Sequence, residues 1–200
     1  MVLERLGFVY EGTERQAFWV GEVCTDNVNY GLLPDEWRSW TSRPLTRPEV
    51  VELVELDSTN DGAYRRLATH KSQERFVSPV IRSFADALLP DIFNGTPLKP
   101  WFRGIAADGE PAGFVMVAEA TNHFPEPYLW RLLVDRRHQR RGIGHAVLDQ
   151  LVDRCRVEGH RRLTVSWGVG KGSPEPLYLR YGFRPTGEMD GDEIVGALDL

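Results

Sequence analysis

The sequence predicts one domain of mixed α and β structure with antiparallel hairpins, preceded by a short appendage. An Asp-Gly turn at 108–109 separates two apolar runs, which is a strong hairpin signal. Apolar residues recur at helical spacing through 143–155. The chain has 200 residues, of which 42% are hydrophobic and 26% charged, as is typical of a soluble globular protein. This order of elements leaves two classes open, α+β and mixed-sheet α/β.

The first forty residues predict a short helical end and then a hairpin. The signals are a helix stop at 6–7, β-prone runs at 17–20 and 28–33, and a turn at Gly21. A proline-containing stretch at 42–48 is typical of a linker. We therefore expect an extension over residues 1–43 and a main domain over residues 44–200.

The first half of the main domain predicts strands and helices in alternation. A helix is expected to begin at Asn60 or Asp61 and to run through Tyr64 to His70. The other expected elements are a strand at 50–56, a helix around 81–89, a loop through 94–97, hairpin strands at 102–107 and 112–118, and a strand at 128–134.

The second half begins with the helix over 143–155, which Gly159 stops. A strand follows at 163–167. Ser173-Pro174-Glu175 then predicts a helix start, because it combines a hydroxyl cap, an early proline and an acid. This helix ends at Gly182, and strands at 183–188 and 193–198 form a last hairpin around 190–191.

Composition argues against several classes of protein. Cys24 and Cys155 lie far apart, and no cysteine or histidine spacing matches a metal site, so we expect neither a disulfide framework nor a metal. The net charge of −5 suits a cationic substrate better than nucleic acid. No apolar run approaches the ~20 residues of a membrane span, and the first residues lack a signal-peptide core. We expect a cytoplasmic protein without membrane or nucleic-acid partners.

The loop before the long helix carries the clearest chemical signal. The strand at 128–134 leads through Arg136, Arg137, Arg140 and Arg141 into Gly142-Ile143-Gly144. Glycines let the backbone approach a ligand, and the N–H groups of a helix N-terminus favour phosphate. Two alternatives stay open on these residues alone. One is a tight turn with solvated charges, and the other is a nucleic-acid patch, although interleaved aromatics are missing.

Three segments resemble the GNAT superfamily of N-acetyltransferases. Residues Gln139-Arg140-Arg141-Gly142-Ile143-Gly144 match that family's Q/R-x-x-G-x-G/A motif, Leu132-Leu133-Val134 stand where its central strand precedes the motif, and 178–183 resemble its YxxxGF segment. The resemblance covers about 48–200 and implies a mostly antiparallel central sheet flanked by helices. Four further segments resemble the bacterial polyamine acetyltransferase-like branch, namely 73–77, 109–116, 127–132 and 187–195.

The resemblance implies acetyl-CoA as donor and assigns roles to individual residues. The amides of Gln139 to Gly144 would hold the pyrophosphate, and the backbone of Leu132 to Val134 would pair with the pantetheine arm. An N–H near Leu133 would polarise the thioester carbonyl. Tyr178 would protonate the leaving thiolate, although without the family it is better explained as a packed aromatic. Lys171 stands where many members have a cofactor-contacting asparagine, and it either reaches a phosphate or is solvated.

An acceptor amine needs a base, because an amine with a pKa of about 10 is mostly protonated at pH 7. The first candidate is Glu119, and Glu126, Glu74 and Glu193 are alternatives, each of which is also explained as a solvated charge. Glu74 and Glu126 would attract a cationic acceptor. Trp130 would line the acceptor cleft or pack in the core.

The first forty residues also resemble the C-terminal end of ribosomal-protein-type N-acetyltransferases. Because this segment lacks the cofactor loop, it should not bind acetyl-CoA by itself. It would be a remnant of a second domain whose hairpin covers a sheet edge or pairs with a second chain as a homodimer, or else a loosely docked extension.

These observations together predict an acetyl-CoA-dependent N-acetyltransferase that acts on a polyamine or another small primary amine. Two alternatives stay open, namely transfer to a protein or peptide α-amine and a non-catalytic acyl-CoA-binding module.

Overall fold

Seven strands form one sheet with the order β10-β11-β9-β8-β7-β6-β3. Neighbouring strands are antiparallel except β8 and β9, which are parallel. The computed structural model describes residues 2–93 and 95–200. The strands are β3 (Val51–Val54), β6 (Lys99–Ala107), β7 (Glu110–Glu119), β8 (Tyr128–Val134), β9 (Arg162–Trp167), β10 (Arg184–Asp190) and β11 (Glu193–Asp199). The expected mixed fold with a mostly antiparallel sheet is confirmed.

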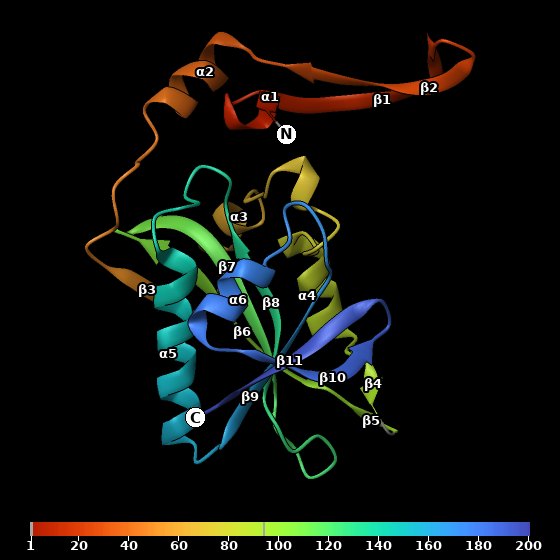
Figure 1. Cartoon of the computed structure of the whole chain (residues 1–200). Coiled ribbons are helices and arrows are strands. Elements are labelled where there is room, and N and C mark those ends of the chain that lie inside the picture. Colours follow the sequence, from red (N-terminus) through yellow and green to blue (C-terminus); the bar gives the residue numbers. More distant parts are fainter. Residues whose placement is uncertain (1, 94) are drawn as a thin grey trace. The chain divides into compact units, whose positions relative to one another are not determined.

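Helices cover both faces of this sheet (Figure 1). They are α3 (Asp61–Tyr64), α4 (Val80–Leu88), α5 (Ile143–Val157) and α6 (Glu175–Tyr181), with a 3-10 turn at Lys71–Gln73. The core on the face of α5 includes Val115 and Val117 of β7. The opposite core includes Phe114 and Met116 of the same strand. Alternate residues of β7 therefore point to opposite faces, as strand geometry requires.

Two expected elements differ in the structure. The helix that begins at Asp61 ends at Tyr64 instead of His70, because the N–H groups of Arg66 and Leu67 turn to carbonyls three residues back. The loop expected over 94–97 is partly a hairpin, since β4 (Ile92–Phe93) pairs with β5 (Thr96–Pro97). Asn94 itself lies outside the described residues.

The chain divides into two compact units, residues 1–44 with 70–72 and residues 45–69 with 73–200. The first unit holds α1 (Val2–Arg5), the hairpin β1 (Val9–Val20) and β2 (Val23–Gly31), and α2 (Pro34–Thr41). The hairpin is present as expected. The helix α2 was not expected. Its signals were Pro34 in the first turn and Glu36, whose carboxylate accepts the Leu33 N–H at 2.8 Å.

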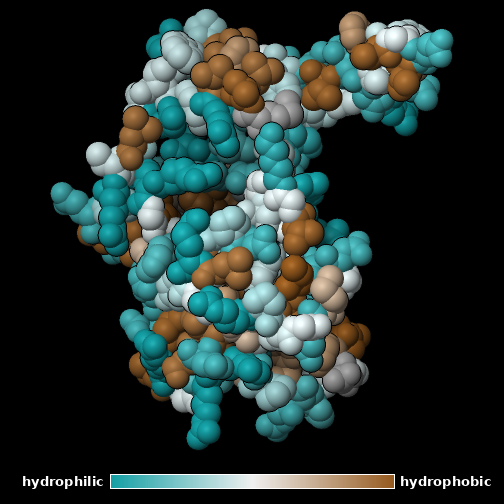
Figure 2. All heavy atoms as spheres, viewed as in Figure 1, coloured by the Kyte–Doolittle hydropathy of each residue, from teal (hydrophilic) through white to brown (hydrophobic). Residues whose placement is uncertain are grey.

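The first unit buries little of its apolar surface. Phe18, Trp19, Val20 and Val23 at the hairpin turn are each about 60% exposed, and brown spheres mark this tip in Figure 2. Its packed part joins the segment 70–72 to the rest of the unit. There the buried Glu4 carboxylate accepts hydrogen bonds from the Ser72 N–H and hydroxyl, and Trp40 lies edge-on to His70.

Candidate active site

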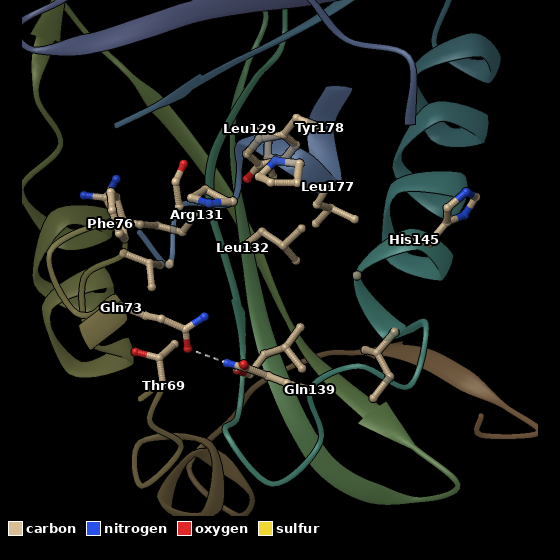
Figure 3. Close-up of a pocket in the computed structure, with 18 of the residues that line it drawn as sticks. Thr69, Gln73, Phe76, Leu129, Arg131, Leu132, Gln139, His145, Leu177 and Tyr178 are labelled. Atoms are coloured by element: carbon tan, nitrogen blue, oxygen red, sulfur yellow. Dashed lines mark hydrogen bonds between the residues drawn. The ribbon is translucent and has the colours of Figure 1, made fainter. Parts of the chain in front are cut away.

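A gap between two parallel strands borders a pocket in the second unit. Strands β8 and β9 are paired only at Tyr128 with Thr164 and at Leu129 with Val165. Beyond Leu129, β8 keeps β7 as its strand partner within the described residues, so its other edge is not covered by a strand. A pocket of about 590 Å³ lies along this edge, and Figure 3 shows Leu129, Arg131 and Leu132 among its lining side chains.

The loop between β8 and α5 turns its backbone toward the pocket. Arg140 and Gly142 both have a positive φ, 65° and 81°, and alternation of this kind gathers successive N–H groups into an anion-binding nest. The first hydrogen bond within α5 runs from the Ala146 N–H to the Gly142 carbonyl. The amides of Ile143 and Gly144 therefore have no acceptor within the helix, and both residues line the pocket.

The Gln139 side chain fixes the start of this loop. Its Nε2 donates to the Val134 carbonyl at 3.1 Å and to Gln73 Oε1 at 2.8 Å, the bond drawn in Figure 3. Val134, Gln139 and Gln73 all line the pocket. The side chain of the motif glutamine thus links the end of β8 to the segment at residue 73 and fixes where the loop begins.

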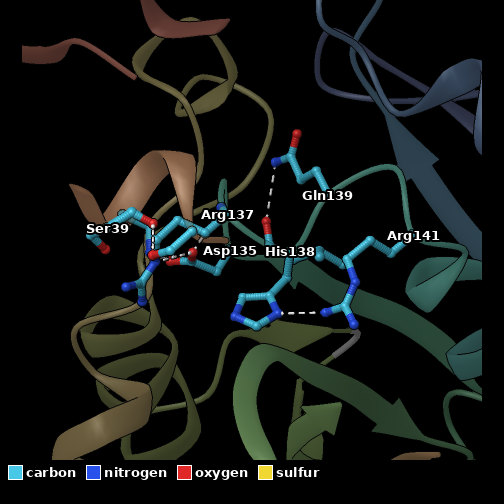
Figure 4. Close-up of polar contacts among 9 residues, drawn as sticks. Ser39, Asp135, Arg137, His138, Gln139 and Arg141 are labelled. Carbon is cyan, nitrogen blue, oxygen red and sulfur yellow. Dashed lines mark hydrogen bonds and ion pairs between the residues drawn. The ribbon is translucent and has the colours of Figure 1, made fainter. Parts of the chain in front are cut away.

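Arg141 is buried and does not line the pocket, so it differs from the solvated loop arginine that a tight turn would carry. Its guanidinium is buried and donates to the Thr46 carbonyl at 2.6 Å and to His138 Nδ1 at 2.9 Å (Figure 4). Because arginine only donates, Nδ1 is the acceptor and the His138 proton lies on Nε2. Burial lowers the pKa of His138, so the ring stays neutral and the pair holds the loop in place.

Tyr178 lies on α6 and lines the pocket, although it is only 5% exposed. Its ring packs against Trp167 and Phe183, with centroids 5.6 Å away in each case. Burial raises the pKa of Tyr178, and the nearby Tyr128 and Glu193 act in the same direction. The phenol therefore keeps its proton at neutral pH.

Most of the sequence-predicted ligand residues meet at this pocket. Those that line it are Trp130, Leu132, Val134, Gln139, Arg140, Gly142, Ile143, Gly144 and Tyr178. Leu133 is buried in the opposite core, as the strand alternation requires, so only its backbone is near this edge. Trp130 borders the pocket but is buried in that same core, so its packing role is the one that the structure shows. Lys171 is exposed and is not among the lining residues, although its carbonyl accepts a hydrogen bond from Arg75.

The carboxylates proposed from the sequence lie elsewhere, with one exception. Glu119 bridges Lys99 at 2.7 Å and Arg154 at 2.5 Å and does not line the pocket. Burial raises the pKa of Glu119, but hydrogen bonds from both cations outweigh it and hold that pKa below its usual value. Glu126 pairs with Arg162, and Glu74 is exposed, and neither lines the pocket.

The exception is Glu193, which lines the pocket together with Tyr128 and Ser166. Sequence reasoning named Glu193 only as an alternative base and missed Tyr128 and Ser166. Hydroxyl residues on strands are common, and no local pattern distinguishes these two. The pairing of strands brings them together.

Comparison with known protein families identifies the family of this chain. The model of the GNAT acetyltransferase family matches residues 53–183. This chain belongs to the GNAT family. It is therefore an N-acetyltransferase, and acetyl-CoA is the donor substrate of the family. Both expectations are confirmed, whereas the likeness to the polyamine branch stays a prediction.

Solved structures show the same fold at low sequence identity. An acetyltransferase from Thermus thermophilus has a TM-score of 0.58 and 19% identity, covering 79% of this chain and 99% of its own. The PaiA N-acetyltransferase from Thermoplasma acidophilum, in complex with coenzyme A, has a TM-score of 0.56, 15% identity and coverages of 76% and 99%. The ribosomal-protein-S18-alanine N-acetyltransferase from Escherichia coli has a TM-score of 0.54 and 20% identity, covering 76% of this chain and 94% of its own. No curated protein matches the chain.

Two further findings bear on cofactors and surroundings. Within residues 2–93 and 95–200, no group of three His, Cys, Asp or Glu side chains is placed to hold a metal ion. Among the helices that the structure describes, none has both the length and the apolar character needed to cross a membrane.

Proposed function

We propose that this enzyme transfers the acetyl group of acetyl-CoA directly to a primary amine held in the described pocket, with a polyamine or another small amine as acceptor. The observation that carries the proposal is the uncovered edge of β8, which leads from the N-terminus of α5 to Tyr178 and a carboxylate. We call residues 132–145 the donor half of this pocket. We call Tyr128, Arg131, Ser166, Tyr178 and Glu193 the acceptor half.

The donor half suits a diphosphate with a linear amide-containing arm. The amides of Ile143 and Gly144 lack acceptors within α5, and the helix dipole favours negative charge at that point. Along β8 beyond Leu129, the edge that no strand covers is able to pair with the amides of a pantetheine arm as a neighbouring strand would, and the Gln139 side chain already occupies the Val134 carbonyl at its end. Bound acetyl-CoA supplies an activated acetyl group, and the residues of this chain orient it.

Tyr178 supplies a proton at the departing sulfur. Its phenol is protonated at neutral pH because burial raises its pKa, and it lines the pocket. An acid placed in this way typically contributes about 10²–10⁴ in rate. The packing of Tyr178 between Trp167 and Phe183 fixes the ring, so the same residue has a structural and a chemical role.

The charges around the acceptor half favour an amine that brings a single cationic group into the pocket. Its side chains include one carboxylate, Glu193, whereas arginines at 131, 140 and 180 also line the pocket. A small amine with one cationic group therefore fits this lining, and a polyamine would direct its remaining cations toward solvent. The alternative acceptor is a peptide α-amine, since the pocket opens to the surface.

The test is release of the CoA thiol from acetyl-CoA with a panel of spermidine, spermine, short diamines, amino acids and short peptides. Release that depends on one amine class, with the acetylated product confirmed by mass, supports the proposal and names that class. Acetyl-CoA binding without release for any amine contradicts it and favours a non-catalytic acyl-CoA-binding module.

We also propose that residues 44–200 carry this activity and that residues 1–43 form an appended unit. All residues that line the pocket belong to the second unit, 45–69 and 73–200. Removal of residues 1–43 is expected to leave kcat unchanged. Sedimentation of the full and shortened chains tests whether the exposed hairpin pairs with a second copy.

A further inference from the structure

Three side chains on neighbouring strands form one hydrogen-bonded chain in the acceptor half. Tyr128 Oη lies 2.7 Å from Ser166 Oγ, and the Ser166 hydroxyl donates to Glu193 Oε2. They come from β8, β9 and β11, which lie side by side in the sheet. All three line the same pocket as Tyr178.

Strand register explains how residues so distant in sequence meet. Tyr128 pairs with Thr164, two residues before Ser166, and Ser166 pairs with Val195, two residues after Glu193. Residues two apart in a strand point to the same face. The three side chains are therefore diagonal neighbours on one face of the sheet, at the point where β8 and β9 separate.

The direction of the hydrogen bonds follows from donor and acceptor chemistry. An ionised carboxylate only accepts, so the one hydroxyl proton of Ser166 is directed to Glu193. Ser166 Oγ must then accept from the Tyr128 phenol. Burial raises the pKa of Tyr128, which keeps that phenol protonated and able to donate. The phenolic oxygen retains lone pairs that can accept an N–H from a ligand in the pocket.

The reaction needs such an acceptor of protons. At pH 7 only about one in a thousand molecules of an amine with a pKa near 10 is unprotonated. Glu193 is the carboxylate in the described pocket lining, and Tyr128 and Ser166 extend its reach toward the ligand.

We propose that Tyr128, Ser166 and Glu193 form a proton relay that deprotonates the acceptor ammonium. The inference rests on the proposed N-acetyl transfer. The ammonium N–H bond breaks as its proton passes to Tyr128 Oη, while the Tyr128 proton passes to Ser166 Oγ and the Ser166 proton to Glu193. One new O–H bond remains, on Glu193, and the neutral amine keeps its electron pair for the acetyl carbon. Tyr128 touches the substrate, and Ser166 and Glu193 act through it.

Several charged or titratable groups surround this relay. Asp190 of β10 lies opposite Glu193 of β11 in the strand register. Both carboxylates act with burial to raise the pKa of Tyr128. Arg131 of β8 acts in the opposite direction on Tyr128. Tyr178 of α6 is close enough for Glu193 to raise its pKa. The relay therefore ends beside two acidic side chains, Glu193 and Asp190.

The test compares pH profiles of kcat/KM for the full chain and its Glu193→Gln variant, using the amine that the panel identifies. The variant is expected to lose about 100-fold at pH 7. Its kcat/KM should then rise tenfold per pH unit toward the pKa of the amine, because the variant reacts only with the unprotonated fraction of the acceptor. The unaltered enzyme should be level over the same range. A fluorinated acceptor of lower pKa should reduce the deficit of the variant.

Matched variants separate the relay from a structural role. Ser166→Ala should reproduce the Glu193→Gln profile, whereas Ser166→Thr, which keeps a hydroxyl, should retain most activity. The double variant should be no worse than either single one, since both break one path. Glu188→Gln, which changes an exposed residue of the same hairpin, is the control.

The outcomes distinguish this inference from the proposed function. If no amine elicits thiol release from the unaltered enzyme, both fail. If release occurs but Glu193→Gln keeps the level pH profile, or loses equally with acceptors of any pKa, the relay alone is overturned. Thermal unfolding of every variant identifies a loss that comes from misfolding, and Ser166→Thr then decides the question.

Discussion

The donor half of the pocket comes from one continuous stretch, residues 132–145, whereas the acceptor half is assembled from side chains of β8, β9, α6 and β11. The donor half offers mainly backbone groups, placed by the positive φ of Arg140 and Gly142. The acceptor half offers hydroxyls and a carboxylate whose positions depend on strand register. Side-chain changes should therefore be tolerated in the first half and costly in the second.

Tyr178→Phe gives the largest expected effect, because it removes one oxygen from the acceptor half. We expect kcat to fall by about 10²–10⁴, since the proposed acid is lost. Binding of acetyl-CoA, measured by calorimetry, should be unchanged. Tyr181→Phe is the control, because its hydroxyl donates to Asp149 and does not line the pocket. Full activity of Tyr178→Phe would leave Tyr178 only its packing role.

Gly142→Ala tests the backbone of the donor half. The added Cβ would meet no atom closer than 3.8 Å, so the effect comes from the φ of +81°. A left-handed alanine costs about 1–2 kcal/mol. We expect acetyl-CoA affinity to fall about 5- to 30-fold as the nest relaxes, with kcat at saturation little changed. A Kd equal to that of the unaltered enzyme would show that the nest is not needed for the donor.

Arg140→Glu tests how much side-chain charge contributes to binding of acetyl-CoA in the donor half. Arg140 is exposed and lines the pocket, so charge reversal should raise the donor KM a few-fold, and salt should reduce the difference. Arg141→Gln is the informative neighbour, because it should lower Tm by loosening the bonds to His138 and Thr46. A salt-insensitive KM in Arg140→Glu would remove this side chain from the donor site.

Glu119→Gln has the smallest expected effect and lies outside both halves. Loss of the bridges to Lys99 and Arg154 should lower stability by less than about 1 kcal/mol at pH 7, since the group is partly exposed. Because the pKa of Glu119 is lowered in the fold, this contribution is present at neutral pH and disappears as pH falls through the folded pKa. Urea unfolding at pH 7 and pH 3 measures it. A large fall in kcat would instead restore Glu119 as a base.

The sequence alone predicted the residues that we assign to the donor half, because their signals are local. A helix N-terminus with a glycine at its cap and another in its first turn encodes its own backbone geometry within a few residues, and the helical spacing of 143–155 follows from packing of one face. The hairpin around 108–109 is equally local, since its turn residues set the register. The family resemblance rests on these same contiguous segments.

Only the tertiary structure showed which charged side chains enter the pocket, because their positions depend on contacts between distant segments. Glu119 and Glu193 both stand at a strand end, and only the sheet order shows that one meets two cations and the other enters the pocket. Arg140 and Arg141 are neighbours in sequence, and burial against Thr46 and His138 separates their roles. Apart from Arg141 with His138, these contacts join residues 20 or more positions apart, so their geometry exists only once the sheet has formed.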